Sequence, residues 1–221
     1  MNNRQNMVDT ALSFIGASEG TTGHKTIVSI YNKISPLPRG YKLKETDAWC
    51  AAFVSVCASV SDNLSAVPAE CGCPEMLKAF EKRGEYFNII ENPRPGDIIF
   101  YDWNGDKVPD HVGIIVEVPD TTSIKVCEGN YNNSVGIRHV GIKNKNILGI
   151  CKPDYKEETM PDWKTEAIKY AMEFGISDGT NPDKYCTRVE CMAMCVRSVD
   201  VACNAMLQAM NEALKKMEGD K

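Results

Sequence analysis

The sequence predicts an α+β protein in which N-terminal helices pack on a five- to six-stranded antiparallel sheet, with a small helical domain at the C-terminus. The apolar side chains recur at helical spacing as far as Gly84 and alternate at the two-residue period of strands from Tyr86 onward. Helices followed by strands are typical of the α+β class. A charged, proline-bounded stretch at 153–161 then separates these elements from a further helical pattern. We therefore expect a first domain at 1–152, a linker at 153–162 and a helical domain at 163–221.

Four helices are expected in the first domain. They cover residues 4–17, residues 27–33, the apolar run that follows Thr46 or Asp47, and Pro74–Gly84. Either Thr46 or Asp47 has a suitable side chain for the N-cap of the third helix, and the apolar run after it is typical of a core helix. Pro74 suits the first position of the fourth helix, and Gly84 suits its end.

From Tyr86 onward the pattern predicts a meander of five or six strands. They cover residues 97–103, 111–118, 123–130, 135–140 and 147–151. Short polar connections between them predict an antiparallel meander.

Composition and charge exclude several classes of protein. The chain has 221 residues, 43% of them hydrophobic, and lacks the ~18 consecutive apolar residues that predict a transmembrane helix. The formal net charge of −5, concentrated in the C-terminal part, gives no basic surface for nucleic acid or anionic lipid. The 10 cysteines include no C-x-x-C pair, which favours synthesis in a reducing compartment over a disulfide framework or a zinc site. The first residues also lack the pattern of a signal peptide.

Cys50 is the first candidate for chemistry, because it lies in the first turn of the third predicted helix. Unpaired backbone N–H groups and the positive end of the helix dipole favour a thiolate at that position, and the thiolate is the nucleophilic form of cysteine. The alternative is a buried structural thiol, since cysteine is among the most buried residue types. Partners elsewhere in the chain decide between the two.

His111 and Glu128 are predicted to share one face of a hairpin. If residues 119–122 form the turn, Val118 pairs with Ser123, and this register places Asn130 opposite His111 and Glu128 opposite Gly113. A glycine at 113 leaves Glu128 room to lean toward the imidazole. A turn one residue longer or shorter sends the acid to the other face, so the inference depends on the turn. A thiol, an imidazole and a carboxylate or amide together are the parts of nucleophilic acyl transfer.

Four motifs carry a family resemblance. They are Asp47–Phe53 (DAWCAAF), Arg94–Phe100 (RPGDIIF), Asp110–Ile115 (DHVGII) and Cys127–Tyr131 (CEGNY). In this order they resemble the CHAP family, the cysteine, histidine-dependent amidohydrolases and peptidases related to the papain-like NlpC/P60 enzymes. The resemblance covers about residues 5–152 and implies a papain-like fold.

The resemblance also implies roles for the site residues. Cys50 corresponds to the nucleophile, His111 to the general base and acid, and Glu128, assisted by Asn130, to the group that orients the imidazole. The backbone N–H of Cys50 is expected to contribute to an oxyanion hole. Trp49 and Tyr131 are expected to shape the substrate cleft, although Trp49 fits a core position equally well.

No metal or other cofactor is expected. The calcium site of some family members is not transferred, because the stretch 41–47 lacks clustered acids. A second set of oxygen ligands has spacings suited to calcium and consists of Asp102, Asn104, Asp106 and Asp110. This loop lacks the glycine and the final glutamate of an EF-hand, so the sequence favours a solvated strand connection.

The C-terminal part contains two further patterns. Residues 163–190 are similar to a single S-layer-homology-like repeat, which implies attachment to a wall polymer. A seam of apolar residues at alternating spacings of three and four consists of Val189, Met192, Val196, Val199, Cys203, Met206, Met210, Ala213 and Met217. The seam fits either packing within the tail or a homo-oligomer.

The resemblance implies hydrolysis of an amide bond in the peptide part of bacterial peptidoglycan, as expected of a phage or prophage endolysin. Such a protein is made in the bacterial cytoplasm and acts at the cell wall after release. One alternative is a wall-remodelling or interbacterial effector hydrolase with the same chemistry. Another is a wall-binding or assembly protein that is no longer catalytic.

Overall fold

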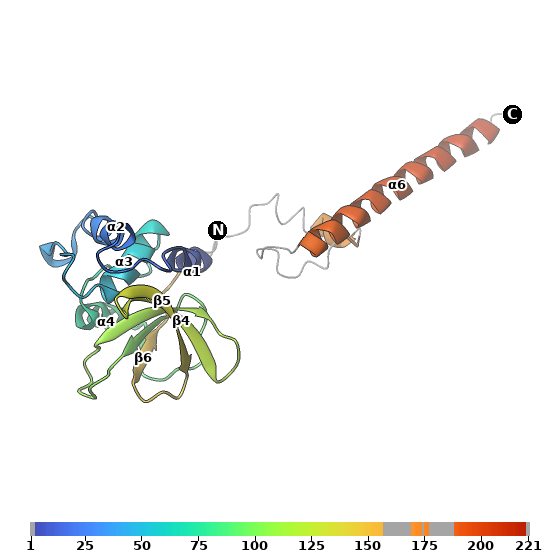
Figure 1. Ribbon diagram of the computed structural model, residues 1–221. Coiled ribbons are helices and arrows are strands. Elements are labelled where there is room, and N and C mark those ends of the chain that lie inside the picture. The colour runs from blue at the N-terminus through green and yellow to red at the C-terminus, as the bar shows by residue number, and fades with distance from the viewer. Residues whose placement is uncertain (1–2, 157–168, 174, 177–187, 220–221) are drawn as a thin grey trace. The chain divides into compact units, whose positions relative to one another are not determined.

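A computed structural model describes residues 3–156, 169–173, 175–176 and 188–219 (Figure 1). The chain divides into two compact units, Met1–Glu158 and Thr159–Lys221. The first unit contains the sheet, four α-helices and all four sequence motifs. The second contains the long helix α6.

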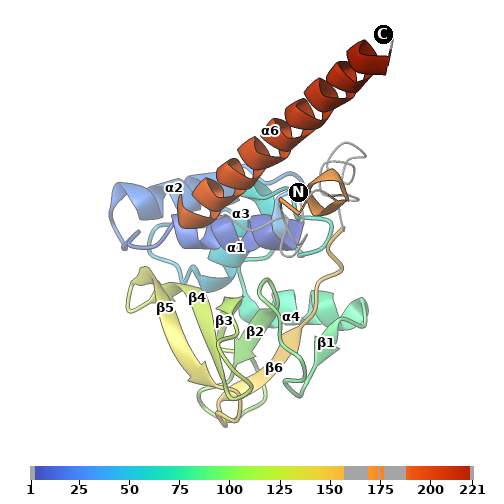
Figure 2. The same cartoon turned by 90° about the vertical axis from the view of Figure 1, so that its right-hand side faces the viewer.

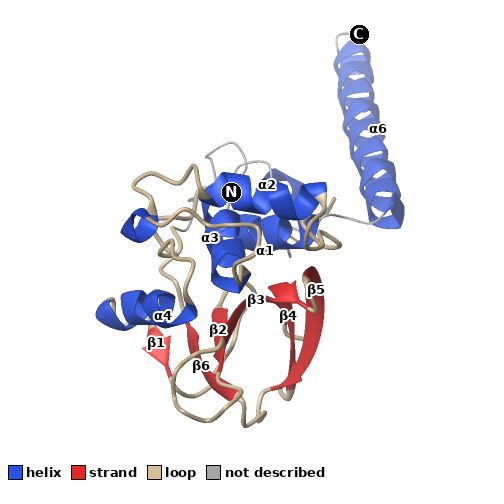
Figure 3. Ribbon diagram, turned by 60° about the vertical axis from the view of Figure 1, so that its left-hand side comes forward, coloured by secondary structure: helices blue, strands red, loops and turns tan. Residues whose placement is uncertain are grey.

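The sheet of the first unit has six strands, and neighbouring strands are antiparallel. Its spatial order is β1-β6-β2-β3-β4-β5. The strands are β1 Tyr86–Phe87, β2 Ile98–Tyr101, β3 His111–Glu117, β4 Ser123–Tyr131, β5 Ser134–Gly141 and β6 Ile147–Cys151. Helices lie along one side of this sheet (Figure 3). The predicted α+β class is confirmed, and the arrangement is consistent with a papain-like fold.

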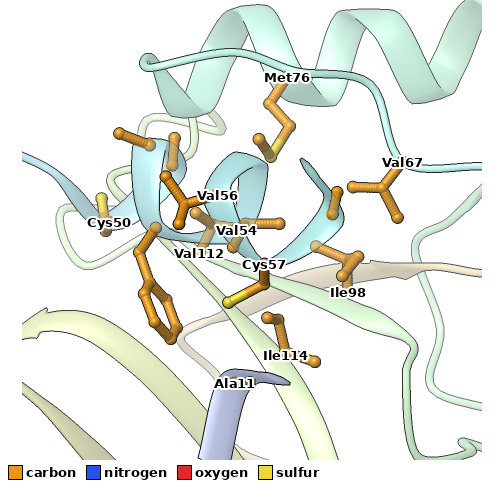
Figure 4. Packing of buried hydrophobic residues seen from close by; sticks show 14 of the residues in the cluster. Ala11, Cys50, Val54, Val56, Cys57, Val67, Met76, Ile98, Val112 and Ile114 are labelled. Carbon is orange, nitrogen blue, oxygen red and sulfur yellow. The ribbon is translucent and has the colours of Figure 1, made fainter. Parts of the chain in front are cut away.

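The helices are α1 Asn3–Ser13, α2 Thr22–Tyr31, α3 Cys50–Val60 and α4 Cys73–Lys82, with a short 3₁₀ turn at Pro38–Gly40 (Figure 2). Helix α3 is central, because every residue from Cys50 to Ala58 is buried. Its side chains pack between Met76 of α4 and the sheet residues Ile98 and Ile114 (Figure 4). A helix apolar on all sides is stable only in such a core position.

Two helices have boundaries that differ from the predicted ones. Helix α1 ends at Ser13 rather than at residue 17, because the chain leaves the helix to bond to β5: the Gly16 N–H donates to the Val135 carbonyl at 3.1 Å. Helix α2 begins at Thr22 rather than near residue 27. Its first backbone bond runs from the Lys25 N–H to the Thr21 carbonyl at 3.0 Å.

The predicted N-cap of α3 is wrong. The helix begins at Cys50 after Trp49, and no side chain caps it. The Asp47 carboxylate instead accepts hydrogen bonds from the Tyr41 hydroxyl at 2.9 Å and the Lys44 N–H at 2.8 Å. Asp47 therefore fixes the turn that precedes the helix, and Cys50 lies at the first helical position.

The hairpin of β3 and β4 combines two registers. Ile114 pairs with Cys127 and Ile115 with Val126, as predicted, but Glu117 pairs with Lys125. The predicted pairing of Val118 with Ser123 is therefore wrong. A β-bulge between Ile115 and Glu117 shifts the register by one residue. The bulge compensates for the difference of one residue at the turn. Ile114 and Ile115, which lie on the side of the candidate site, therefore keep the predicted partners.

The end of the first unit includes part of the predicted linker. Tyr155 is buried, and its hydroxyl donates to the Gly96 carbonyl at 2.6 Å. The Arg4 guanidinium lies 4.7 Å from the centre of the Tyr155 ring and forms an ion pair with Asp97. The first helix and residue 155 thus meet at the loop that precedes β2.

The second unit contributes helix α6, Arg188–Gly219. Five residues of the apolar seam are exposed, namely Met192, Val196, Val199, Cys203 and Met206. The seam side chains of Val189, Met210, Ala213 and Met217, and most of the repeat-like segment 163–190, lie outside the described residues. No helix in the described part of the chain meets the length and hydropathy needed to cross a membrane.

Candidate active site

Cys50 is the first residue of α3, and its side chain lies at the boundary between core and surface, with 5% of the residue exposed. The thiol is free. N–H groups in the first turn of a helix have no intrahelical acceptor, and the helix dipole places partial positive charge there. This position favours the thiolate, as the sequence predicts.

His111 is the first residue of β3, and its ring is close enough to the Cys50 thiol for the two groups to shift each other's pKa. Its other partner is Glu128, whose Oε2 lies 3.0 Å from the His111 Nε2 atom. Because Nε2 faces Glu128, Nδ1 is the ring nitrogen left for Cys50. The three side chains therefore form a continuous chain from thiol to imidazole to carboxylate.

These residues meet at the rim of the sheet. His111 lies two and four residues before Gly113 and Ile115 and so shares their face, which bears the second hydrophobic cluster. The helices cover the opposite face, where Ile114 and Cys127 pack. His111 and Cys50 can approach each other because each is the first residue of its element, at the end of the strand and of the helix.

The charges of the pair depend on one another. The pKa of the Cys50 thiol lies well below its ordinary value because a hydrogen bond from Cys73 and the hydrogen bond and charge of His111 outweigh burial. Burial lowers the pKa of His111, but hydrogen bonds and charges from Cys50 and Glu128 raise it to about 9. Both shifts favour a pair made of a thiolate and an imidazolium.

Arg138 on β5 is a member of the site that the sequence reasoning missed. Its Nε atom lies 2.9 Å from both carboxylate oxygens of Glu128, which is completely buried. Glu128 thus lies between two cationic groups, Arg138 and His111. The signal was available in the pairing of Val126 with Arg138, which places Arg138 on the same face as Glu128.

Gly113 provides the space for this carboxylate. A Cβ atom at Gly113 would lie 2.5 Å from Val126 Cγ1 and 2.7 Å from Glu128 Cγ. The predicted room for Glu128 beside Gly113 is therefore present in the structure.

Aromatic rings surround Arg138 on its exposed side. The guanidinium lies 4.2 Å from the ring centre of Tyr131 and 5.2 Å from that of Trp103. Trp103 stacks on Tyr101 with ring centres 4.9 Å apart and remains 42% exposed. The aromatic surface beside the site is therefore formed by Trp103 and Tyr131.

Cys73 is the second residue that the sequence reasoning missed. It begins α4, as Cys50 begins α3, and the two sulfur atoms lie 3.4 Å apart. The hydrogen bond with Cys50 and burial raise the pKa of Cys73 far above its ordinary value. The opposite shifts of the two pKa values favour Cys73 as the donor and Cys50 as the acceptor.

Two of the predicted site residues, Trp49 and Asn130, are not part of the contacts that join Cys50, His111 and Glu128. Trp49 is completely buried and packs on His24 with ring centres 5.0 Å apart, which corresponds to the core alternative. Asn130 has a left-handed backbone conformation with φ of 58° beside an irregularity in the β4–β5 ladder. Among the described residues, the ladder pairs between β3 and β4 extend from Ile114–Cys127 to Glu117–Lys125 and do not reach Asn130.

The loop considered for calcium is organised by its own backbone. The Asp102 carboxylate accepts hydrogen bonds from the Gly105 and Lys107 N–H groups, and Asp110 accepts one from the Trp103 N–H. Asn104 and Asp106 accept similar bonds within the loop. In the described part of the chain, no group of three or more His, Cys, Asp or Glu side chains is arranged to hold a metal ion.

A shallow polar depression of about 540 Å³ lies where the 18–20 loop meets the turn between β4 and β5. Its lining includes Ser18, Glu19 and Asn132 to Ser134. The Glu19 N–H donates to the Asn133 carbonyl at 2.7 Å and joins the two segments. Tyr131, which contacts Arg138, directly precedes this turn.

Comparison with known families finds one match. Residues 41–130 match the family model described as CHAP domain, and the matched range contains Cys50, His111, Glu128 and Asn130. The match supports a CHAP-domain protein and agrees with the family that the four motifs resemble. A search of curated proteins found no match to the chain.

Proposed function

We propose that this protein is a cysteine-dependent hydrolase that cleaves an amide bond in the peptide part of bacterial peptidoglycan. The observation that carries the proposal is the chain of contacts from Cys50 through His111 to Glu128. The CHAP domain match supports peptidoglycan as the substrate class.

The first half of the reaction uses the ion pair. The Cys50 thiolate attacks the carbonyl carbon of the amide and forms a tetrahedral intermediate. The backbone N–H of Cys50, which lacks an intrahelical acceptor, is a candidate donor to the oxyanion. The His111 imidazolium then gives its proton to the leaving amine, and a thioester remains on Cys50.

The second half restores the enzyme. Neutral His111 takes a proton from water, the hydroxide attacks the thioester carbonyl, and the thiolate leaves. Glu128 positions the imidazole through Nε2 in both halves and stabilises its charged form. Arg138 supports the buried Glu128 in turn through the contacts of its Nε atom with both carboxylate oxygens.

Purified bacterial walls provide the direct test. The wild type should clear the walls and release fragments, and Cys50→Ala should do neither. Cys71→Ser is the matched control, since Cys71 is a partly buried thiol outside the contact chain and its loss should leave clearing intact. Equal clearing by wild type and Cys50→Ala would overturn the proposal. Binding without clearing by the wild type would favour the non-catalytic wall-binding alternative.

The bond is identified by mass spectrometry of the fragments. A new L-alanine amino terminus identifies an N-acetylmuramoyl-L-alanine amidase. A new terminus within the stem or cross-bridge peptide identifies an endopeptidase.

We propose that this hydrolase is an endolysin of a phage or prophage. Residues 163–221 would then attach it to the wall or to a second copy of the chain. The resemblance of residues 163–190 to an S-layer-homology-like repeat supports the attachment role. Wall-pelleting of the full chain and of the chain truncated after Glu158 tests it, because equal pelleting would assign binding to the first unit alone. A wall-remodelling or effector role uses the same chemistry and is distinguished by whether the gene lies among phage lysis genes.

A further inference from the structure

We propose that Cys50 and Cys73 form a reversible disulfide that switches off the candidate nucleophile. This inference concerns the regulation of the proposed active site and therefore rests on the proposed function. It makes the pair a modification site for peroxide, a small oxidant.

The geometry of the two helix starts carries the proposal. Cys50 begins α3 and Cys73 begins α4, and their sulfur atoms are in contact at 3.4 Å. Both thiols are free. A disulfide bond is about 2.05 Å long, so the sulfur atoms need to approach by less than the length of one covalent bond.

Access to the pair is limited to small molecules. Cys50 is 5% exposed and Cys73 is 6% exposed. Hydrogen peroxide is little larger than water, whereas a tripeptide disulfide such as oxidised glutathione needs a wider approach. The other thiols of the first unit are the partly buried Cys71 and the buried Cys57, Cys127 and Cys151, and none of them is in a sulfur–sulfur contact among those that the structure describes.

The chemistry starts at Cys50, which is the thiolate of the pair. Its sulfur attacks one oxygen of peroxide, the O–O bond breaks, and the hydroxide that leaves is protonated to water. The product is a sulfenic acid on Cys50. The Cys73 sulfur then attacks the Cys50 sulfur, the S–S bond forms, and the sulfenic oxygen leaves with the Cys73 proton as a second water.

The two steps are coupled through charge. The leading cause of the high pKa of Cys73 is its hydrogen bond with Cys50, while the charges of Asp110 and Glu75 contribute less. Oxidation of Cys50 removes that thiolate and hence the strongest of these effects. Cys73 therefore becomes a better nucleophile only after Cys50 has reacted.

The consequence is protection as well as inhibition. A sulfenic acid without a neighbouring thiol proceeds to sulfinic acid, which reductants do not reverse. A disulfide with Cys73 stops at a state that a dithiol reductant restores. We therefore expect the wild type to recover from peroxide and a variant without the Cys73 thiol to lose activity permanently.

The experiment treats the full chain with hydrogen peroxide, blocks free thiols and maps disulfide-linked peptides by mass spectrometry. We expect a link between the peptides that contain Cys50 and Cys73, and its disappearance after dithiothreitol. Cys71→Ser, which removes the neighbouring partly buried thiol, should leave the link in place. In a parallel assay on purified walls, reductant should restore most of the wild-type activity and less than roughly a tenth of the Cys73→Ser activity.

Peptide mapping distinguishes the two levels of the proposal. A Cys50–Cys73 link in a protein that never clears walls would leave the modification site standing and overturn the hydrolase. If the untreated protein clears walls and peroxide converts Cys50 to sulfinic acid or links it to Cys71, the switch is overturned and the hydrolase stands. Circular dichroism checks that Cys73→Ser is folded. The switch is also rejected if peroxide treatment of the folded wild type gives no Cys50–Cys73 link.

Discussion

The Nε atom of Arg138 lies 2.9 Å from each carboxylate oxygen of Glu128, and the opposite side of that carboxylate faces His111. Glu128 is completely buried, so these two cationic groups replace the water that would otherwise solvate its charge. The proposed catalytic chain therefore has a fourth member that acts through Glu128 and not on the substrate.

Replacement of Arg138 tests this support. Arg138→Leu should lower kcat/KM roughly tenfold or more, by analogy with the loss of groups that orient metal ligands. It should also lower the free energy of unfolding by about 2 kcal/mol, because a charged hydrogen bond to a buried group is lost. Arg138→Lys keeps the charge without the side-on Nε contact and should retain part of both. Unchanged kcat/KM in Arg138→Leu would remove Arg138 from the site.

The pH profile tests the ion pair. Activity needs the Cys50 thiolate and the His111 imidazolium, so kcat/KM should fall at high pH as His111 loses its proton with a pKa of about 9. Glu128 raises that pKa, and Glu128→Gln should therefore move the basic limb to lower pH. The variant should also lose roughly 10²–10⁴-fold in rate, since the imidazole is no longer held in position. A basic limb that does not move would show that Glu128 does not act through His111.

Gly113→Ala tests the space beside Glu128. The new methyl would lie 2.5 Å from Val126 Cγ1 and 2.7 Å from Glu128 Cγ, so Glu128 must shift away from His111. We expect a loss of about 1–3 kcal/mol in stability, measured by urea unfolding, together with a fall in kcat. Gly141→Ala on β5 is the control, because the atom nearest to the new methyl would lie at an ordinary 3.8 Å. Similar losses in both variants would point to a general effect on the sheet.

The apolar seam of α6 tests self-association. Met192 is 69% exposed and Val196 is 61% exposed, which leaves an apolar face without cover within the described residues. We expect the full chain to sediment as an oligomer at micromolar concentration and Val196→Lys to shift it toward the monomer. Asp200→Lys alters charge on the same helix outside the seam and serves as the control. A monomeric wild type would remove the oligomer hypothesis.

The sequence alone was sufficient for the features that depend on local pattern. Cys50 followed a turn and preceded an apolar run, and His111 and Glu128 occurred at the spacing of a hairpin. The predicted register is correct at Ile114 and Ile115 only because a bulge between Ile115 and Glu117 offsets the turn, and no local signal in the strand predicts that bulge. The N-cap of α3 was missed because Asp47 makes its bonds before the helix begins.

Cys73 and Arg138 were missed for a different reason. Each joins the site through an element other than the one that holds its partner. Cys73 contacts Cys50 because the N-termini of α3 and α4 lie side by side. The spacing of the two cysteines in the sequence does not predict this contact. A prediction of Arg138 would have needed the register between β4 and β5, in addition to the register between β3 and β4. The missing information in both cases was the arrangement of elements in space.

The position of Tyr155 determines where the first unit can be cut. Its ring covers Arg4 and its hydroxyl bonds to Gly96, so a recombinant fragment ending at Lys152 would expose this corner to solvent. The corner lies directly before β2, the strand that pairs with β3 and hence neighbours His111. A fragment ending at Glu158 keeps the corner closed and is the shorter protein of choice for crystallisation and for assays of the isolated unit.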